Sequence, residues 1–323
     1  MNKKIIKMIV IGGFVVAGMG FGPAVFAYEI QDLSDAPVKN DFVLGPGKIE
    51  LFMDPGDETS KDLMITNRRG ETMNFRVEIE DFRGSRDPQQ SIVLLGQEKG
   101  PYSLRDYVKP EVMEFSLTHG QRMVLPVKIS IPEDAEPGGL YGSILFRAVS
   151  PLSELAVEQE KAKGQVSVEA RLGCLFFVRI SGDVKEDGSL KDLTVAKRFY
   201  EKTPIVFNLL FENNSSIHLA PYGIIEIKNL MGRKIDEINV DPWFVMPDSL
   251  RTKEVKWEKK VLFGRYIATA AINRGYDDII DQKSVTFWII PWKPIAVGVA
   301  ALLLIAFFLR WIAKNFEVKR KSG

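Results

Sequence analysis

Short runs of alternating apolar and polar residues recur along most of the chain, and turn signals separate them. In "TMNFRVEIEDF" and "RMVLPVKISI", for example, apolar side chains occupy most alternate positions. Alternation with a period of two places apolar side chains on one face of a strand, while long amphipathic helical patterns are nearly absent. The pattern predicts an all-β protein built from sandwiches.

The runs form two groups, which we interpret as two tandem immunoglobulin-like β-sandwich domains. The first covers residues 28–182 with about seven strand-like runs, and the second covers residues 185–290 without a convincing sequence repeat of the first. An insertion at residues 83–110, whose "YSLRDYV" favours one short helix, and a polar helix-prone excursion at residues 152–164 interrupt the first group. Long insertions on a sandwich often carry function.

The first 27 residues have the pattern of a secretory signal. Three lysines precede an apolar run that ends in "AVFA", which predicts a signal peptide at residues 1–27 with cleavage after Ala27. The alternative is an uncleaved first membrane helix. Either interpretation places the following residues outside the cytoplasm.

The other end of the chain predicts one transmembrane helix at residues 292–312. Trp292 and Trp311 bracket an uncharged apolar run, Arg310 is placed to snorkel, and a basic tail follows at residues 313–323. This length suits a hydrocarbon core of about 30 Å, and the basic tail indicates the cytoplasmic side. The alternative, a buried core helix, fits poorly because the tail follows at once. We expect a single-pass protein of the cell membrane with an extracytoplasmic body.

Charge argues against a nucleic-acid partner. Without the signal and the tail, 35 basic and 41 acidic residues remain, so the body has a net charge of −6. It therefore lacks the positively charged surface that is typical of nucleic-acid-binding proteins.

Cys174 is the single cysteine, which excludes an intramolecular disulfide and suggests a bacterial envelope. Because Cys174 lies in the apolar run "RLGCLFFVRI", we interpret it as a core residue.

No pattern of catalytic, cofactor-binding or metal-binding residues stands out. His119 and His218 belong to different domains, and no paired metal-ligand spacing, nucleophile elbow, Walker loop or dinucleotide fingerprint occurs. Glu78 and Glu80 are two positions apart on a predicted strand, so their carboxylates share one face, which we interpret as the solvent-exposed face. We therefore expect a non-enzymatic protein without cofactor or metal.

Exposed aromatic rings are the remaining candidates for partner binding. Tyr102 and Tyr107 in the insertion, and Trp243 in "DPWFVMP", are placed either to present flat rings to a glycan or protein, or to cover the ends of the sandwiches.

The glycine-rich segment "PEDAEPGGLYGSILF" predicts a turn followed by a strand. A phosphate-binding loop needs a helix after its glycines, whereas the run that follows here favours a strand. Tyr141 is expected to point its ring into the core and its hydroxyl at a nearby loop.

Several segments together resemble the WxL-interacting proteins of Gram-positive bacteria. These are "IELFMDPGDETSKDLMITN", with Pro55, Gly56 and Asn67, then "IPEDAEPGGLYGSILF", "VMPDSLRTKEV" and "GRYIATAAI" followed by "VTFWI". Asp248 stands where the family tends to have Asn. The resemblance implies a first domain that binds peptidoglycan and a second that binds a surface protein or host ligand.

Three functions follow as hypotheses. The leading one is a membrane-anchored envelope protein that binds cell-wall polymer or another surface protein. The first alternative is an extracytoplasmic assembly chaperone that acts by strand pairing. The second is an envelope hydrolase in which Ser103, Asp106 or Glu111 of the insertion and its flank meets His119.

Overall fold

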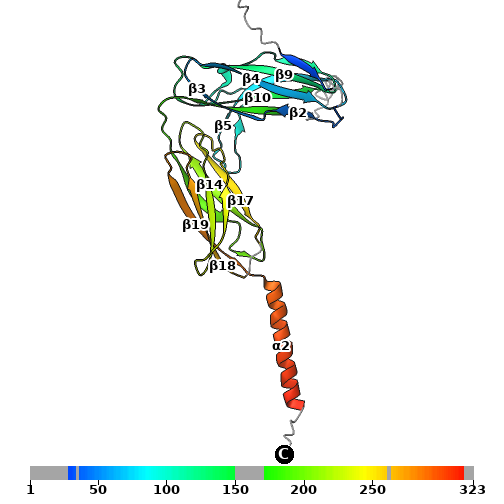
Figure 1. The fold of residues 1–323 in the computed structure, drawn as a ribbon, viewed down its shortest axis with the longest axis vertical. Helices are drawn as coiled ribbons and strands as arrows, with labels where there is room; N and C mark the ends of the chain where they lie inside the picture. Colours follow the sequence, from blue (N-terminus) through cyan, green and yellow to red (C-terminus); the bar gives the residue numbers. More distant parts are fainter. Residues whose placement is uncertain (1–27, 34–35, 150–170, 260–262, 316–323) are drawn as a thin grey trace, which may run out of the picture.

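The computed structural model describes residues 28–33, 36–149, 171–259 and 263–315. Over these ranges the chain is all-β apart from one 3₁₀ turn and one helix near the C-terminal end, which confirms the predicted fold class. The first domain lies across one end of the second, and the helix leaves the other end (Figure 1). The predicted signal peptide, its cleavage after Ala27 and the excursion at 152–164 lie outside the described residues.

Two facing sheets form the first sandwich. One has the strand order β1-β9-β4-β2 with β7 also paired to β9, and the other has the order β3-β11-β10-β5-β6 with β8 also paired to β5. The sequence suggests about seven strands, and the additional ones are short pieces at the edges. The strands are β1 (Glu29–Asp32), β2 (Phe42–Gly45), β3 (Lys48–Met53), β4 (Glu58–Asn67), β5 (Met73–Arg83), β6 (Val93–Leu94), β7 (Val108–Pro110), β8 (Glu114–Leu117), β9 (Gln121–Ser130), β10 (Gly138–Val149) and β11 (Arg171–Ile180).

The second sandwich pairs a three-stranded sheet, β12-β14-β17, with a five-stranded sheet, β13-β19-β18-β15-β16. Alternation explains the packing: along β14 every second side chain, from Ile205 to Phe211, is buried. The strands are β12 (Gly188–Val195), β13 (Phe199–Tyr200), β14 (Ile205–Asn213), β15 (Tyr222–Asn229), β16 (Lys234–Val240), β17 (Ser249–Trp257), β18 (Gly264–Asn273) and β19 (Ile280–Ile289).

Both sandwiches contain the same buried asparagine at the end of a long strand. The Asn67 amide donates to the carbonyls of Glu71 and Leu117, each at 2.8 Å, and its Oδ1 accepts from Arg69 N. Asn213 repeats the pattern with the carbonyls of Ile217 and Val245 and with Ser215 N. A fully bonded amide can be buried at little cost, and here it ties a loop to its sheet.

One helix, α2 (Trp292–Asn315), follows the second domain. Its segment Ile295–Ile312 has a mean hydropathy of 2.5 and is long and apolar enough to cross a membrane. Trp292 is its first residue, and Arg310 and Trp311 are exposed near its end. The insertion at 83–110 forms β6, β7 and a single 3₁₀ turn, η1 (Arg105–Tyr107), so the helix favoured by "YSLRDYV" is only one turn long.

Candidate functional site

The insertion leaves the first domain and packs against the second. Ser85 O accepts from Leu250 N at 3.0 Å, and Pro88 O accepts from Thr252 N at 2.9 Å, so the insertion pairs with the outer edge of β17. The contact is close: a Cβ on Gly84 would lie 2.4 Å from Ser249 Cβ, which leaves room only for glycine. The insertion therefore joins the two domains.

An aromatic cluster lies at the same junction between the two domains. Phe177 packs edge-on against Tyr141 at 5.7 Å and against Phe244 at 5.3 Å between ring centroids, and against the His218 ring at 5.2 Å. The first two rings belong to the first domain and the others to the second. Edge-to-face aromatic pairs add stability beyond their buried area.

Tyr141 and His218 share two hydrogen bonds across the junction. His218 N donates to the Tyr141 hydroxyl at 2.6 Å, and that hydroxyl lies 3.2 Å from His218 Nδ1. A phenolic hydroxyl both accepts and donates, so Tyr141 can accept from His218 N and also bond the ring nitrogen of the same residue. Burial lowers the pKa of His218 to about 4 and raises that of Tyr141 well above its usual value, so both groups are uncharged at neutral pH.

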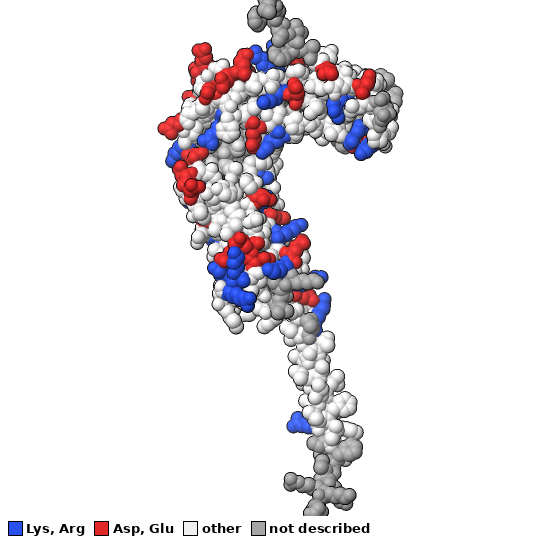
Figure 2. Space-filling view, viewed as in Figure 1, with Lys and Arg blue, Asp and Glu red and all other residues white. Residues whose placement is uncertain are grey.

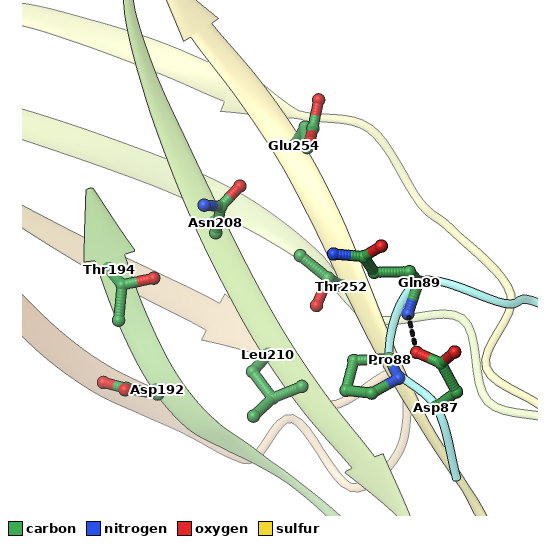
Figure 3. Close-up of a pocket in the computed structure, with 9 residues that line it drawn as sticks. All are labelled: Asp87, Pro88, Gln89, Asp192, Thr194, Asn208, Leu210, Thr252 and Glu254. Carbon is green, nitrogen blue, oxygen red and sulfur yellow. Dashed lines mark hydrogen bonds between the residues drawn. The ribbon is translucent and has the colours of Figure 1, made fainter. Parts of the chain in front are cut away.

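Beside the junction, an open cleft of about 660 Å³ lies on the outer face of the three-stranded sheet. Strand register builds its floor in two rows, because residues two apart on a strand share a face. The loop Asp87–Gln89 of the insertion forms one wall, and Asp87 Oδ1 accepts from Gln89 N at 3.0 Å (Figure 3). The rows are Asp192, Leu210 and Thr252, then Thr194, Asn208 and Glu254.

The lining of this cleft is rich in hydrogen-bond acceptors. Asp87, Asp192 and Glu254 contribute carboxylates, and Asn208 Oδ1 is buried without a partner among the described residues. Its nine lining residues include no His, Cys or Ser, so the cleft offers hydrogen bonds and negative charge to a ligand. No residue of the cleft was singled out individually from sequence, because its polar side chains look like ordinary outward-facing residues of their strands.

The two tyrosines proposed for partner binding both pack within the protein. The Tyr102 hydroxyl donates to Asp248 at 2.8 Å across the junction, and burial together with this bond raises the pKa of Tyr102 to about 12. Tyr107 packs against the core of the first domain. Trp243 is buried in the core of the second. Partner binding by Tyr102 and Tyr107 stays a prediction, and both rings are only partly accessible.

The residues of the hydrolase hypothesis are not brought together. Ser103 pairs with Tyr141 at the junction, and Asp106 forms an ion pair with Lys99. His119 is held by other groups: its Nε2 lies 2.9 Å from Ala36 O, and its Nδ1 accepts from Gly70 N. Within the part of the chain that the structure describes, no group of three or more His, Cys, Asp or Glu residues is placed to hold a metal ion.

Three side chains test the sequence interpretation directly. Glu80 is only 6 % exposed, so its predicted solvated position is wrong: the Arg171 side chain reaches it from β11, two strands away, and pairs with it at 3.0 Å. Tyr141 bonds a loop as predicted, but its ring lies in the junction cluster instead of the core of its own domain. Cys174 is a core residue, and burial raises the pKa of its thiol to about 12.

Comparisons with known proteins find no matching family model and no matching curated protein. Three solved structures are similar at 9–12 % identity: the class 5 fimbriae chaperone CfaA, the CsuC–CsuE chaperone–tip subunit complex of Acinetobacter baumannii and the Pseudomonas aeruginosa CupB2 chaperone. The matches cover 78 %, 75 % and 75 % of this chain and 100 %, 98 % and 98 % of the others, with TM-scores of 0.35, 0.37 and 0.33. Similarity at this level adds nothing about function.

Proposed function

We propose that the protein is a membrane-anchored, non-enzymatic binding protein of the cell envelope that holds an extended segment of another surface polypeptide. The observation that carries this proposal is the outer edge of β17, where two carbonyls of the insertion already accept from its N–H groups, as the carbonyls of an added strand would. Strand addition to an open sheet edge is a general mode of peptide recognition.

The start of β17 has partners along this edge, whereas its end has no backbone partner there among the described residues. Leu250 N and Thr252 N donate to the insertion, and the direction of N–H groups alternates along a strand. Glu254 N and Lys256 N therefore point the same way, both residues are exposed, and β17 is the last strand of its sheet. An incoming strand can continue the ladder from the point where Pro88 ends it.

The acceptor-rich cleft lies next to this open edge and is suited to select the side chains of the incoming strand. Main-chain hydrogen bonds supply sequence-independent affinity, and pockets beside the edge supply specificity. The carboxylates of Asp87, Asp192 and Glu254 favour a segment with basic, amide or hydroxyl side chains. We expect the bound segment to alternate such residues with outward-facing ones.

The proposed anchor is α2, which would hold the body outside the cytoplasm with its tail inside. Strand pairing at β17 corresponds to the assembly-chaperone hypothesis if the bound segment belongs to a subunit awaiting assembly. Peptidoglycan binding by the first domain, which the resemblance to WxL-interacting proteins implies, stays a prediction that the same experiment tests.

A photo-crosslinking amino acid at Glu254 in the full chain, expressed in its own cells, tests the proposal. We expect a polypeptide to crosslink there through one extended segment, identified by mass spectrometry. Lys256→Pro removes an edge N–H and should abolish the crosslink, whereas Lys256→Gln keeps the N–H and should retain it.

The fold of both variants is checked by thermal unfolding. Equal crosslinking of Lys256→Pro and Lys256→Gln would overturn strand pairing. Retention of the protein on purified peptidoglycan without any polypeptide crosslink would favour the wall-polymer function instead.

A further inference from the structure

The end of the second domain that lies away from the first exposes large apolar side chains. Met231 is 93 % exposed and Leu230 64 % exposed at the tip of the turn between β15 and β16. Phe199, the first residue of β13, is 62 % exposed, and Phe263, just before β18, is 59 % exposed. Apolar side chains gathered at one end of a soluble domain indicate a contact surface.

Strand register places these loops at one end of the sandwich. Asn229, next to the tip, pairs with Tyr266 near the start of β18, and Phe199 pairs with Trp288 near the end of β19. Gly264, which follows Phe263, pairs with Ile289. The tip, Phe199 and Phe263 therefore lie around the point where the chain leaves the domain.

Basic side chains surround the same apolar tips. Three acidic neighbours are each paired with a lysine: Glu201 with Lys293, Asp236 with Lys259 and Glu237 with Lys234. Over the described residues, Arg198, Arg233 and Arg265 make no ion pair with an acidic side chain. Figure 2 shows basic residues at this end of the domain, near the start of α2, with acidic residues beside them.

The connection to α2 is too short to let this end move far from the helix. Ile290 N donates to Tyr200 O at 2.7 Å, so the chain is still bonded to the sandwich at Ile290. Pro291 alone separates it from Trp292, where α2 begins, and the apolar segment starts at Ile295. At a rise of about 1.5 Å per residue, Ile295 lies only about 5 Å along the helix from Trp292.

We propose that this end of the second domain docks on the bilayer that α2 crosses, an inference that rests on the membrane anchoring proposed above. Leu230, Met231, Phe199 and Phe263 would enter the interfacial region, and the arginines would contact lipid phosphates. Apolar and aromatic side chains with nearby basic residues are favourable at this depth, most of all on anionic lipid.

Docking would set the height of the binding edge on β17. Trp257 ends that strand on the membrane side, and Glu254 is three residues away from it. With a rise of about 3.3 Å per strand residue, the open edge from Lys256 to Glu254 spans about 3–10 Å along the strand from Trp257. The partner segment would thus be held close to the membrane surface at a fixed orientation.

Depth measurements on single labels test this inference. Cys174 is buried, so a polarity-sensitive fluorophore can be attached to a new cysteine at Met231 in the full chain. The protein is placed in nanodiscs of phosphatidylcholine and phosphatidylglycerol in equal parts, with or without brominated acyl chains as quenchers. We expect strong quenching at Met231→Cys and none at Phe52→Cys, an exposed position in the first domain.

A label at Ile305→Cys within α2 separates the inference from its premise. Quenching at Ile305 but not at Met231 would overturn docking while leaving the anchor intact. Absence of quenching at Ile305 would overturn the anchor itself, and docking with it.

Charge reversal tests the contribution of the arginines. Combining Arg198→Glu with Arg233→Glu should reduce quenching at Met231 several-fold in the mixed discs and much less in pure phosphatidylcholine. Unchanged quenching in the mixed discs would overturn the proposed phosphate contacts.

Discussion

The two ends of the second sandwich are built from the same kind of loops but have opposite surroundings. At the end near the first domain, Met246 is 1 % exposed, and His218 lies in an aromatic cluster. At the other end, Met231 is 93 % exposed on a turn tip. Apolar loop residues at both ends show that a sandwich can use each of its ends for contact, one with a neighbouring domain and one, we propose, with lipid.

This contrast between the two ends of the second sandwich predicts which side chains contribute to the free energy of unfolding. Contacts between the domains bury aromatic rings and satisfy polar groups, whereas the exposed tip makes few contacts within the protein. Substitutions near the junction should therefore change the free energy of unfolding, and those at the tip should change membrane contact alone.

Tyr141→Ala is expected to have the largest effect. It empties a fully buried ring position between the domains and should lower the free energy of unfolding by about 3–5 kcal/mol. Tyr141→Phe keeps the ring but leaves His218 N without its acceptor, for a loss of about 1–3 kcal/mol. Denaturant unfolding of the full chain in detergent measures both. A neutral Tyr141→Phe would contradict the role of the hydroxyl.

Acidification should weaken the junction through His218. Its pKa is about 4 in the folded protein and 6.5 without burial, so the unfolded chain binds the proton more readily. Stability is therefore retained above pH 6.5 and lost as the pH falls from 6.5 toward 4, by about 1.4 kcal/mol at pH 5.5. Comparing pH-dependent unfolding with that of His218→Asn isolates the contribution. Identical pH profiles would contradict the buried neutral state.

Substitution at the exposed tip should have the smallest effect on stability. Met231→Ala is expected to change the free energy of unfolding by less than about 0.5 kcal/mol, because an exposed side chain loses little on truncation. Met246→Ala is the matched control at the buried end and should cost about 2–5 kcal/mol. Similar losses for the two variants would refute the contrast between the ends.

Alternation along the chain was sufficient to predict the long strands of both sandwiches but not the short edge strands, and the apolar run from Ile295 was sufficient to predict α2. The buried asparagines were missed because the sequences after Asn67 and Asn213 differ, while the bonds that these amides make are the same. Glu80 was misplaced because alternation assigns a side chain to a face of the sheet without telling what covers that face.

The sequence by itself determined the all-β fold, the apolar helix and the lack of a recognisable catalytic motif, because periodicity and composition are local properties. Only the tertiary structure decided that the insertion pairs with β17, that Tyr141 meets His218 and that three strands assemble one acceptor-rich cleft. Those contacts join residues tens to more than a hundred positions apart. They depend on strand register and on how one sandwich packs against the other. Neither is specified by a local sequence pattern.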